Sequence, residues 1–198
     1  MAEEKVLTRA IAENFLFYQG GNLGGFTSIE DDAAEALAKY QGEELDLSGL
    51  TMLGDMAAEA LAKHQGDLNL RGLTTLSDKA AEALAKHQGS LYLSGLTTLS
   101  DKAAEALVKY QDELNLSGLT MLSDKAAEAL AKHQGALSLS GLTTLSDKAA
   151  EALAKHQGLL VLLSLTKDQV EKYKSHSQNW LTKGVQWVKN LLNKFRLP

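Results

Sequence analysis

The stretch GLTTLSDKAAEALAKHQG, residues 72–89, decides the fold of this 198-residue chain, because it occurs again without change at residues 141–158. The shorter string AAEALAKHQG also begins at Ala57 and Ala126, and a variant of it begins at Ala33. The step between copies is 23 residues, apart from a first step of 24. Self-similarity at a fixed period of this length predicts a stack of like units rather than one irregular core.

Each unit contains two patterns with different periods. From Leu68 to Leu70 apolar and variable residues alternate, which favours a short strand. Residues 77–88 are rich in alanine, which favours a helix, and Ser77 is placed to cap its N-terminus. We expect Gly89 to end this helix in a left-handed conformation. The equivalent strands begin at Leu45, Leu91, Leu114, Leu137 and Leu160.

Neither so short a strand nor a helix of about three turns is stable by itself, so the units must support one another. Stacking would set the leucines of one unit against the same leucines of the next. It would also pair the strands in parallel and lay the helical alanines close to the sheet. Because helices are wider than strands, we expect the stack to curve with the sheet on its inner side.

The repeat resembles those of the leucine-rich-repeat family, whose units of about 20 to 29 residues carry a strand and a helix each. It is most similar to the bacterial repeats of 23 residues with the phrase GLTxLSDxAAEALA. The resemblance covers nearly the whole chain. It implies an α/β fold, a right-handed leucine-rich-repeat solenoid with a short parallel β-sheet on the concave face and α-helices on the convex face.

One position departs from the common pattern of that family. Leu73 and its equivalents stand where most members carry an inward asparagine or cysteine. The asparagine ladder that satisfies buried loop amides is therefore missing. We expect Thr74 and Thr75, with their equivalents, to take over that hydrogen bonding.

The two ends of the chain depart from the repeat, as the terminal units of a stack must, because each has an uncovered side. Residues 7–20 align with residues 76–89 as a degenerate first helix. We expect an N-terminal cap over residues 1–24, leucine-rich repeats over residues 25–163 and a C-terminal helical cap over residues 164–198.

The charge of the chain is split between its body and its C-terminal end. Residues 1–165 carry 13 Lys/Arg and 23 Asp/Glu, whereas residues 166–198 carry 7 and 2. Residues 179–195 have the apolar stripe of an amphipathic helix. This helix is interpreted either as part of the cap or as a surface that docks on a membrane or a partner. The second interpretation assigns the contacts to Trp180, Lys183, Trp187, Lys189 and Phe195.

No catalytic pattern is found in the repeat. Ser77 and His87 lie at opposite ends of the predicted helix, about 15 Å apart, which is too far for a catalytic triad within one unit. The chain has no cysteine and no phosphate-binding loop motif. We expect a protein that is not an enzyme and needs no cofactor. The acidic body disfavours nucleic acid as a partner.

Histidines recur at one position of the repeat, and tyrosine replaces them twice. We expect these side chains on the outer face at the helix C-termini, where the helix dipole favours positive charge. Tyrosine is not an equivalent ligand for a divalent metal, so we do not expect a metal site there. The residues at this position are Tyr40, His64, His87, Tyr110, His133 and His156.

The side chains between and around the strand leucines vary from unit to unit, while the helix hardly changes. By the alternation of a strand they face away from the core, onto the concave sheet, which is the usual binding surface of such stacks. We predict that a protein or peptide binds there, with tyrosine and arginine as anchors. The predicted contacts are Asp46, Asn69, Arg71, Tyr92, Asn115 and Ser138.

Two alternatives remain open. These positions could be solvated and free to drift, with the apolar C-terminal end of the face covered by the cap. Near-identical units could instead reflect an engineered or recently expanded array without an evolved ligand. The N-terminus lacks the basic start and apolar core of a secretory signal, and the longest apolar run, Leu159 to Leu163, is too short to span a bilayer. We therefore expect a cytoplasmic protein.

Overall fold

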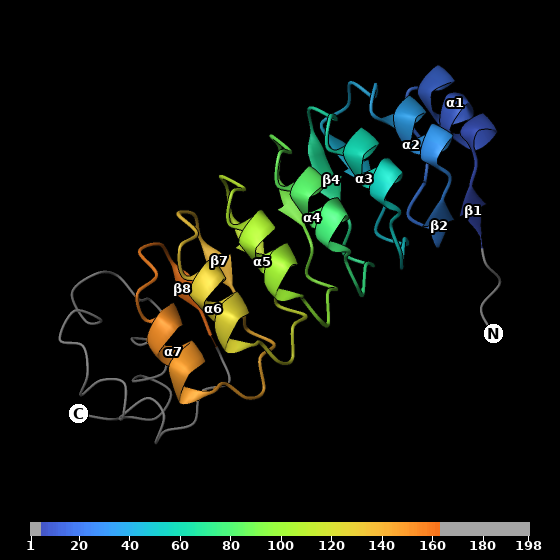
Figure 1. The fold of residues 1–198 in the computed structure, drawn as a ribbon. Coiled ribbons are helices and arrows are strands. Elements are labelled where there is room, and N and C mark those ends of the chain that lie inside the picture. The colour runs from blue at the N-terminus through green and yellow to red at the C-terminus, as the bar shows by residue number, and fades with distance from the viewer. Residues whose placement is uncertain (1–4, 163–198) are drawn as a thin grey trace, which may run out of the picture.

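Helices and short strands alternate along residues 5–162, which are the residues that the computed structural model describes (Figure 1). The helices are α1 (Arg9–Phe17), α2 (Asp31–Leu37), α3 (Asp55–Leu61), α4 (Asp78–Leu84), α5 (Asp101–Leu107), α6 (Asp124–Leu130) and α7 (Asp147–Leu153). The strands are β1 (Val6–Leu7), β2 (Ser28–Ile29), β3 (Glu44–Asp46), β4 (Asp67–Asn69), β5 (Leu91–Tyr92), β6 (Leu114–Asn115), β7 (Leu137–Ser138) and β8 (Leu160–Val161). The chain is thus an α/β protein built from repeated helix–strand units.

Strands β3 to β8 form one parallel sheet in the order of the sequence. Equivalent leucines pair across it, for example Leu68 with Leu91 and Leu137 with Leu160. The parallel pairing expected from the repeat is therefore confirmed. The sequence analysis missed β1 and β2, which form a second, two-stranded parallel sheet near the N-terminus.

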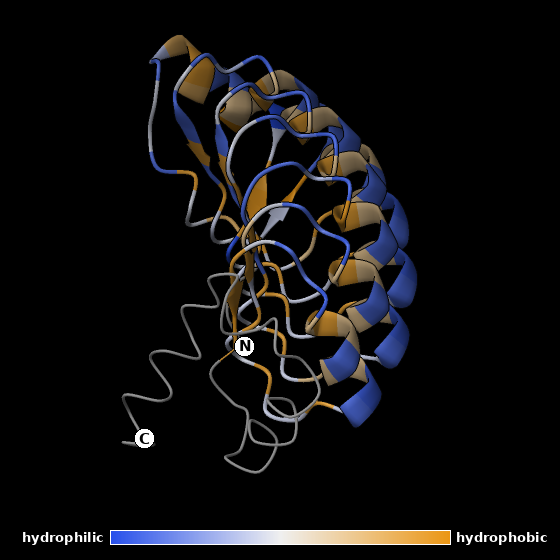
Figure 2. Ribbon diagram, turned by 90° about the vertical axis from the view of Figure 1, so that its left-hand side faces the viewer, coloured by the Kyte–Doolittle hydropathy of each residue, from blue (hydrophilic) through white to orange (hydrophobic). Residues whose placement is uncertain are grey.

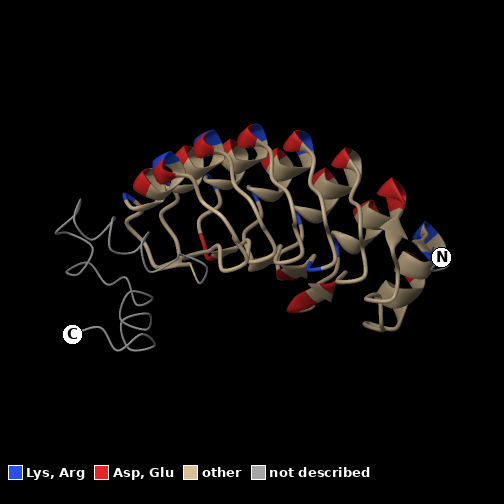
Figure 3. Cartoon of the chain, turned by 90° about the horizontal axis from the view of Figure 1, so that it is seen from below, with Lys and Arg blue, Asp and Glu red and all other residues tan. Residues whose placement is uncertain are grey.

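The units stand in a curved row, with the helices on the outer side and the strands on the inner side (Figures 2 and 3). Each helix packs against the next helix, and each strand of the larger sheet pairs with the next strand. Polar residues lie on the outward side of the helices, and apolar residues face the sheet (Figure 2). We call the strand side of this row the inner face.

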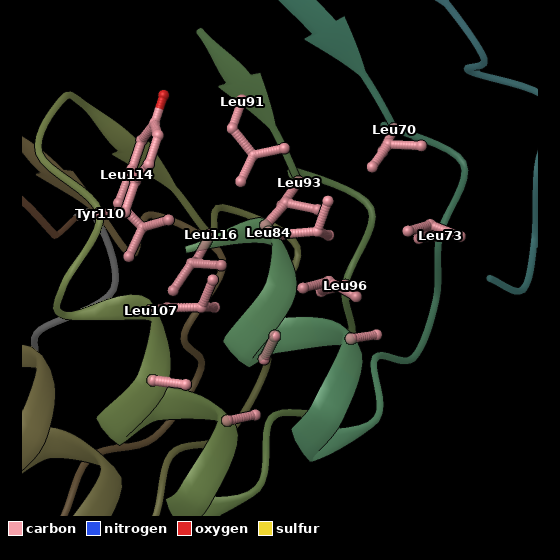
Figure 4. Close-up of a cluster of buried hydrophobic side chains, with 14 of the residues drawn as sticks. Leu70, Leu73, Leu84, Leu91, Leu93, Leu96, Leu107, Tyr110, Leu114 and Leu116 are labelled. Carbon is pink, nitrogen blue, oxygen red and sulfur yellow. The ribbon is translucent and has the colours of Figure 1, made fainter. Parts of the chain in front are cut away.

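The core between helices and sheet is made of the leucines and alanines that the repeat supplies. Leu84, Leu93 and Leu96 are fully buried, as are Ala80 and Ala81, which lets the helices lie close to the sheet. Figure 4 shows how these leucines of neighbouring units meet. Burying one leucine side chain stabilises a fold by about 1.5–3 kcal/mol.

The helices are shorter than expected. α4 ends at Leu84, and the amides of Lys86 and His87 then donate to Ala83 and Leu84 oxygens in tighter turns at 3.0 Å each. The left-handed conformation expected for Gly89 is wrong, because among residues 5–162 only Gln19, Gly20 and Gly21 have positive φ. Glycine is required at position 89 for another reason: a Cβ there would clash with the carbonyl oxygen of Gly66.

Serine caps the helix as expected and also links one unit to the next. The Oγ of Ser77 accepts a hydrogen bond from the Ala80 amide at 3.0 Å. The hydroxyl of Ser100 donates to the carboxylate of Asp78 in the preceding unit, and Ser123 donates to Asp101 in the same way. Bonds of this kind tie the N-termini of α4 to α7 to the helix before each of them.

Threonines link neighbouring units, but they do not take the role expected for them, because their hydroxyls donate to exposed carbonyl oxygens instead of accepting from buried amides. The carbonyl oxygen of Thr74 accepts from both the amide and the hydroxyl of Thr97, at 3.0 and 3.2 Å. Thr120 accepts the same pair of bonds from Thr143, at 3.0 and 3.1 Å. The first threonine of the pair makes these bonds, and the second, such as Thr75, does not.

We predict that Leu93→Ala lowers the free energy of unfolding by about 2–5 kcal/mol, because it leaves a cavity between two stacked units. Chemical denaturation followed by circular dichroism measures the change. The exposed Thr98→Ala is the matched control and should change stability by less than about 0.5 kcal/mol. Equal effects of the two substitutions would contradict the assigned core.

Candidate functional site

Five of the six residues predicted to bind a partner form one row across the inner face. Each is the last residue of its strand, and the register pairs Asp46 with Asn69, Asn69 with Tyr92, Tyr92 with Asn115, and Asn115 with Ser138. The sixth, Arg71, follows β4 by two residues. The neighbouring leucines point into the core, so period-two alternation placed this row correctly on the strands.

The centre of the row is a stacked pair of side chains. The guanidinium carbon of Arg71 lies 4.3 Å from the centre of the Tyr92 ring. The hydroxyl of Tyr92 donates to Asp67 at 3.4 Å. A cation over an aromatic face is a favourable arrangement that holds both groups in place. This pair links the turn after β4, which carries Arg71, with strand β5, which carries Tyr92, on the inner face.

Asn69 is not the accessible contact residue that the sequence analysis expected, because only 6% of its surface is exposed. Its amide group donates to Glu44 at 3.1 Å, and its oxygen accepts from the Arg71 amide at 3.4 Å. The side chain therefore positions its neighbours. Its polar atoms are occupied by the fold, which leaves little of it for a partner.

The same local turn follows three strands of the sheet. Asp46 accepts from the Ser48 amide at 3.0 Å, and Asn115 accepts from the Ser117 amide at 3.1 Å, as Asn69 does from Arg71. Aspartate and asparagine commonly close such turns through their side-chain oxygen. These residue types are thus partly explained by the turn that they close. Asp46 is nevertheless exposed and Asn115 half-buried, so both remain accessible to a partner.

Asp67 belongs to this cluster and was not among the predicted contacts. Its carboxylate accepts from the Ser90 amide at 2.9 Å and from the Tyr92 hydroxyl. The hydrogen bond from the Ser90 amide is the main reason that the pKa of Asp67 is lowered. It lies two residues before Asn69, so strand alternation alone could have found it.

A pocket of about 370 Å³ opens beside the stacked pair, between strands β5 and β6. It is of the size of small ligand sites. Of the predicted contacts, Arg71, Tyr92 and Asn115 line it, whereas Asp46 and Ser138 lie outside. The other lining residues are Ser90, Leu91, Tyr110, Asp112 and Glu113. Neither Asp112 nor Glu113 was among the predicted contacts, although Glu113 lies two residues before Asn115, as Asp67 does before Asn69.

Three of the four recurring histidines are buried and His156 is half-buried, which corrects the expectation of an outer, charged position. His64, His87 and His133 are 1%, 4% and 0% exposed. The rings of His64 and His87 stack with centroids 6.4 Å apart, and those of His133 and His156 with centroids 6.3 Å apart. The side chains pack one unit onto the next instead of interacting with the helix dipole at the surface.

Tyrosine takes the same place in this column of rings. Tyr40 stacks on His64 with centroids 6.0 Å apart. Tyr110 is buried, and its hydroxyl donates to the Gly89 oxygen at 2.6 Å. Burial raises the pKa of Tyr110 to about 12. We call these side chains the ring column: Tyr40, His64, His87, Tyr110, His133 and His156.

Burial also lowers the pKa of three histidines in the ring column, His64, His87 and His156. The nearby carboxylate of Asp67 raises the pKa of His64 and His87 but does not cancel the effect of burial. The charge of His64 lowers the pKa of His87, because the two rings are neighbours. Burial therefore favours the neutral form of these three rings over the charged form.

We predict that the protein loses stability as the pH falls from about 8 to about 5.5. A histidine with a lowered folded-state pKa stabilises the fold fully above its unfolded pKa of about 6.5 and progressively less below it. Urea unfolding at several pH values measures the loss. The variant H64Y/H87Y, which uses the residue found at position 110, should show a smaller pH dependence. An unchanged pH dependence would contradict the burial of neutral histidines.

The predicted contacts of the C-terminal helix, Trp180, Lys183, Trp187, Lys189 and Phe195, lie outside the described residues, as does the predicted cap over 164–198. Within residues 5–162, no helix is long and apolar enough to cross a membrane. In the same part of the chain, no group of three or more His, Cys, Asp or Glu side chains could hold a metal ion.

The class that this architecture defines is a repeat protein of helix–strand units with one parallel sheet along its inner face. Comparisons with protein-family models, with curated proteins and with solved structures found no match.

Proposed function

We propose that this chain is a right-handed leucine-rich-repeat solenoid that has no catalytic activity and binds a protein or peptide on its inner face. The 23-residue unit supports membership in the leucine-rich-repeat family, because its leucines fill the core at the same places in the repeated copies. The curvature supports the choice of the inner face as the binding surface, because the concave side of a stacked repeat protein brings side chains from many units around one partner.

The observation that carries this proposal is the pocket beside the stacked Arg71 and Tyr92. Tyrosine and arginine are the residue types that most often dominate binding energy, and they do so when held rigidly at the centre of an interface. Here the Tyr92 hydroxyl donates to Asp67, and the guanidinium of Arg71 stacks on the Tyr92 ring. The side chains of this surface would therefore lose little conformational entropy when a partner binds.

The distribution of variation among the units supports the same surface. The helix sequence DKAAEAL is identical in α4, α5, α6 and α7, whereas the last residue of the strand is Asn69, Tyr92, Asn115, Ser138 and Val161 in turn. The outer side therefore presents the same groups repeatedly. The inner face alone offers a distinct pattern that one partner could recognise.

Selection of peptides from a display library against the full chain tests this proposal. We expect selected peptides, once synthesised, to bind the wild-type chain and to lose about tenfold or more in affinity for R71A/Y92A. The matched control K102A/E105A changes two exposed side chains of α5 on the outer side and should bind normally. Peptides that bind R71A/Y92A as well as wild type, but not the control, would contradict the site.

A further inference from the structure

We infer that the partner of the inner face is an extended basic peptide segment, which places a lysine or arginine side chain in the pocket between β5 and β6 and an apolar end over β7 and β8. This inference rests on the proposed binding function and adds the chemistry of the ligand. It is carried by the distribution of charge and apolar residues over the face.

The inner face is acidic over its N-terminal two thirds. Figure 3 shows acidic residues on the first strands of the larger sheet. The carboxylates of Glu44, Asp46, Asp112 and Glu113 belong to exposed residues, and within residues 5–162 they form no ion pair with a basic side chain. Arg71 is the basic residue among them, and it is stacked on Tyr92.

The outer side of the units from α4 to α7 is balanced, whereas α2 and α3 carry an excess of acidic residues on the outer side as well. The helix of each unit from α4 to α7 carries an aspartate and a glutamate, which a lysine in the helix and a lysine shortly after it offset; Asp78, Lys79, Glu82 and Lys86 are an example. The uncompensated charge of these units therefore lies on the inner face. Carboxylates on a concave surface reinforce one another and attract cations more strongly than scattered ones.

The pocket itself contains acceptors for a cationic side chain. Asp112 and Glu113 line one part of it, and Ser90 and Asn115 contribute polar groups. Tyr92, whose ring already carries the Arg71 guanidinium, and the buried Tyr110 contribute an aromatic part, which suits the methylene groups of a lysine. Arg71 also lines the pocket, so its three charged residues carry a net charge of −1 (two carboxylates and one guanidinium), which a cationic side chain would neutralise and an acidic one would increase.

Charge disappears toward the C-terminal end of the face. Ala136, Ser138 and Ser140 follow in the unit of β7, and Leu159 and Val161 in the unit of β8. Leu159 is 44% exposed, which makes it an apolar contact available to a partner. The ligand that complements both regions is basic at one end and apolar at the other.

The width of the face sets the length of this ligand. Parallel strands lie about 4.8 Å apart, so the six strands from β3 to β8 span about 24 Å. An extended peptide advances about 3.3 Å per residue, and about seven residues would cross the sheet. A short linear segment is therefore sufficient to reach both regions.

The test uses a fluorescein-labelled synthetic peptide of about eight residues, in which lysine alternates with serine in one half and leucine with serine in the other. The reversed sequence and a version with glutamate in place of lysine are measured with it. Fluorescence anisotropy with the full chain should show binding of at least one lysine peptide and none of the glutamate peptide. Binding should weaken steeply as salt rises to about 0.5 M.

The variant D112N/E113Q should weaken binding of the lysine peptide by about tenfold. The matched control E82Q/E105Q removes two exposed carboxylates from outer helices and should leave it unchanged. Equal effects of the two variants, equal binding of the lysine and glutamate peptides, or no binding of any lysine peptide overturns the inference. A peptide of residues 166–198 that binds more tightly than the probe overturns the assignment to a separate partner.

The proposed function and this inference fail differently. Display-selected peptides that depend on Arg71 and Tyr92 but carry no basic residues would uphold binding on the inner face and refute the basic ligand. Selected peptides that ignore Arg71 and Tyr92 would refute the site itself.

Discussion

The stacking of each unit directly on the one before it is the constraint on which the whole structure depends. Within a unit, two or three strand residues and a helix of seven cannot bury a core. Between units, the leucines of one unit pack against those of the next. The backbones also lie so close that a Cβ at Gly95 would clash with the carbonyl oxygen of Arg71. The Ser77–Asp55 and Thr97–Thr74 hydrogen bonds also join neighbouring units. Stability therefore grows by contacts between nearest neighbours.

This constraint explains which features the sequence could predict. The repeat length of 23 residues determines the positions of the strands, their parallel pairing and the leucine core together. The period of the repeat was therefore sufficient to predict all three. The ring column was misplaced, because histidine is polar and its position after a helix suggested the surface. Its burial depends on contacts with the next unit, such as the stacking of His64 on His87, which the sequence of one unit does not contain.

The candidate site was predictable in its location and less so in its composition. Strand alternation placed Tyr92 and Asn115 on the inner face, but it could not distinguish a contact from a supporting residue. Asn69 is such a support, because its amide group is used by Glu44 and its oxygen by Arg71. The pocket also needs Asp112, which lies in the turn before the strand where no periodic pattern applies. Strand alternation places Glu113 on the inner face, but it could not show that this side chain lines a pocket.

Amide hydrogen exchange measured by NMR tests the central claim, the stacking of units, most directly. The amides of Leu70 and Leu116 donate to Tyr92 and Ser138 oxygens of the following unit, at 3.0 and 2.9 Å. The stacked structure predicts that both exchange slowly, with protection that rises and falls together when the pH or denaturant concentration is changed. Fast exchange of these two amides in a chain that keeps its helical circular dichroism would contradict the stacking of the units.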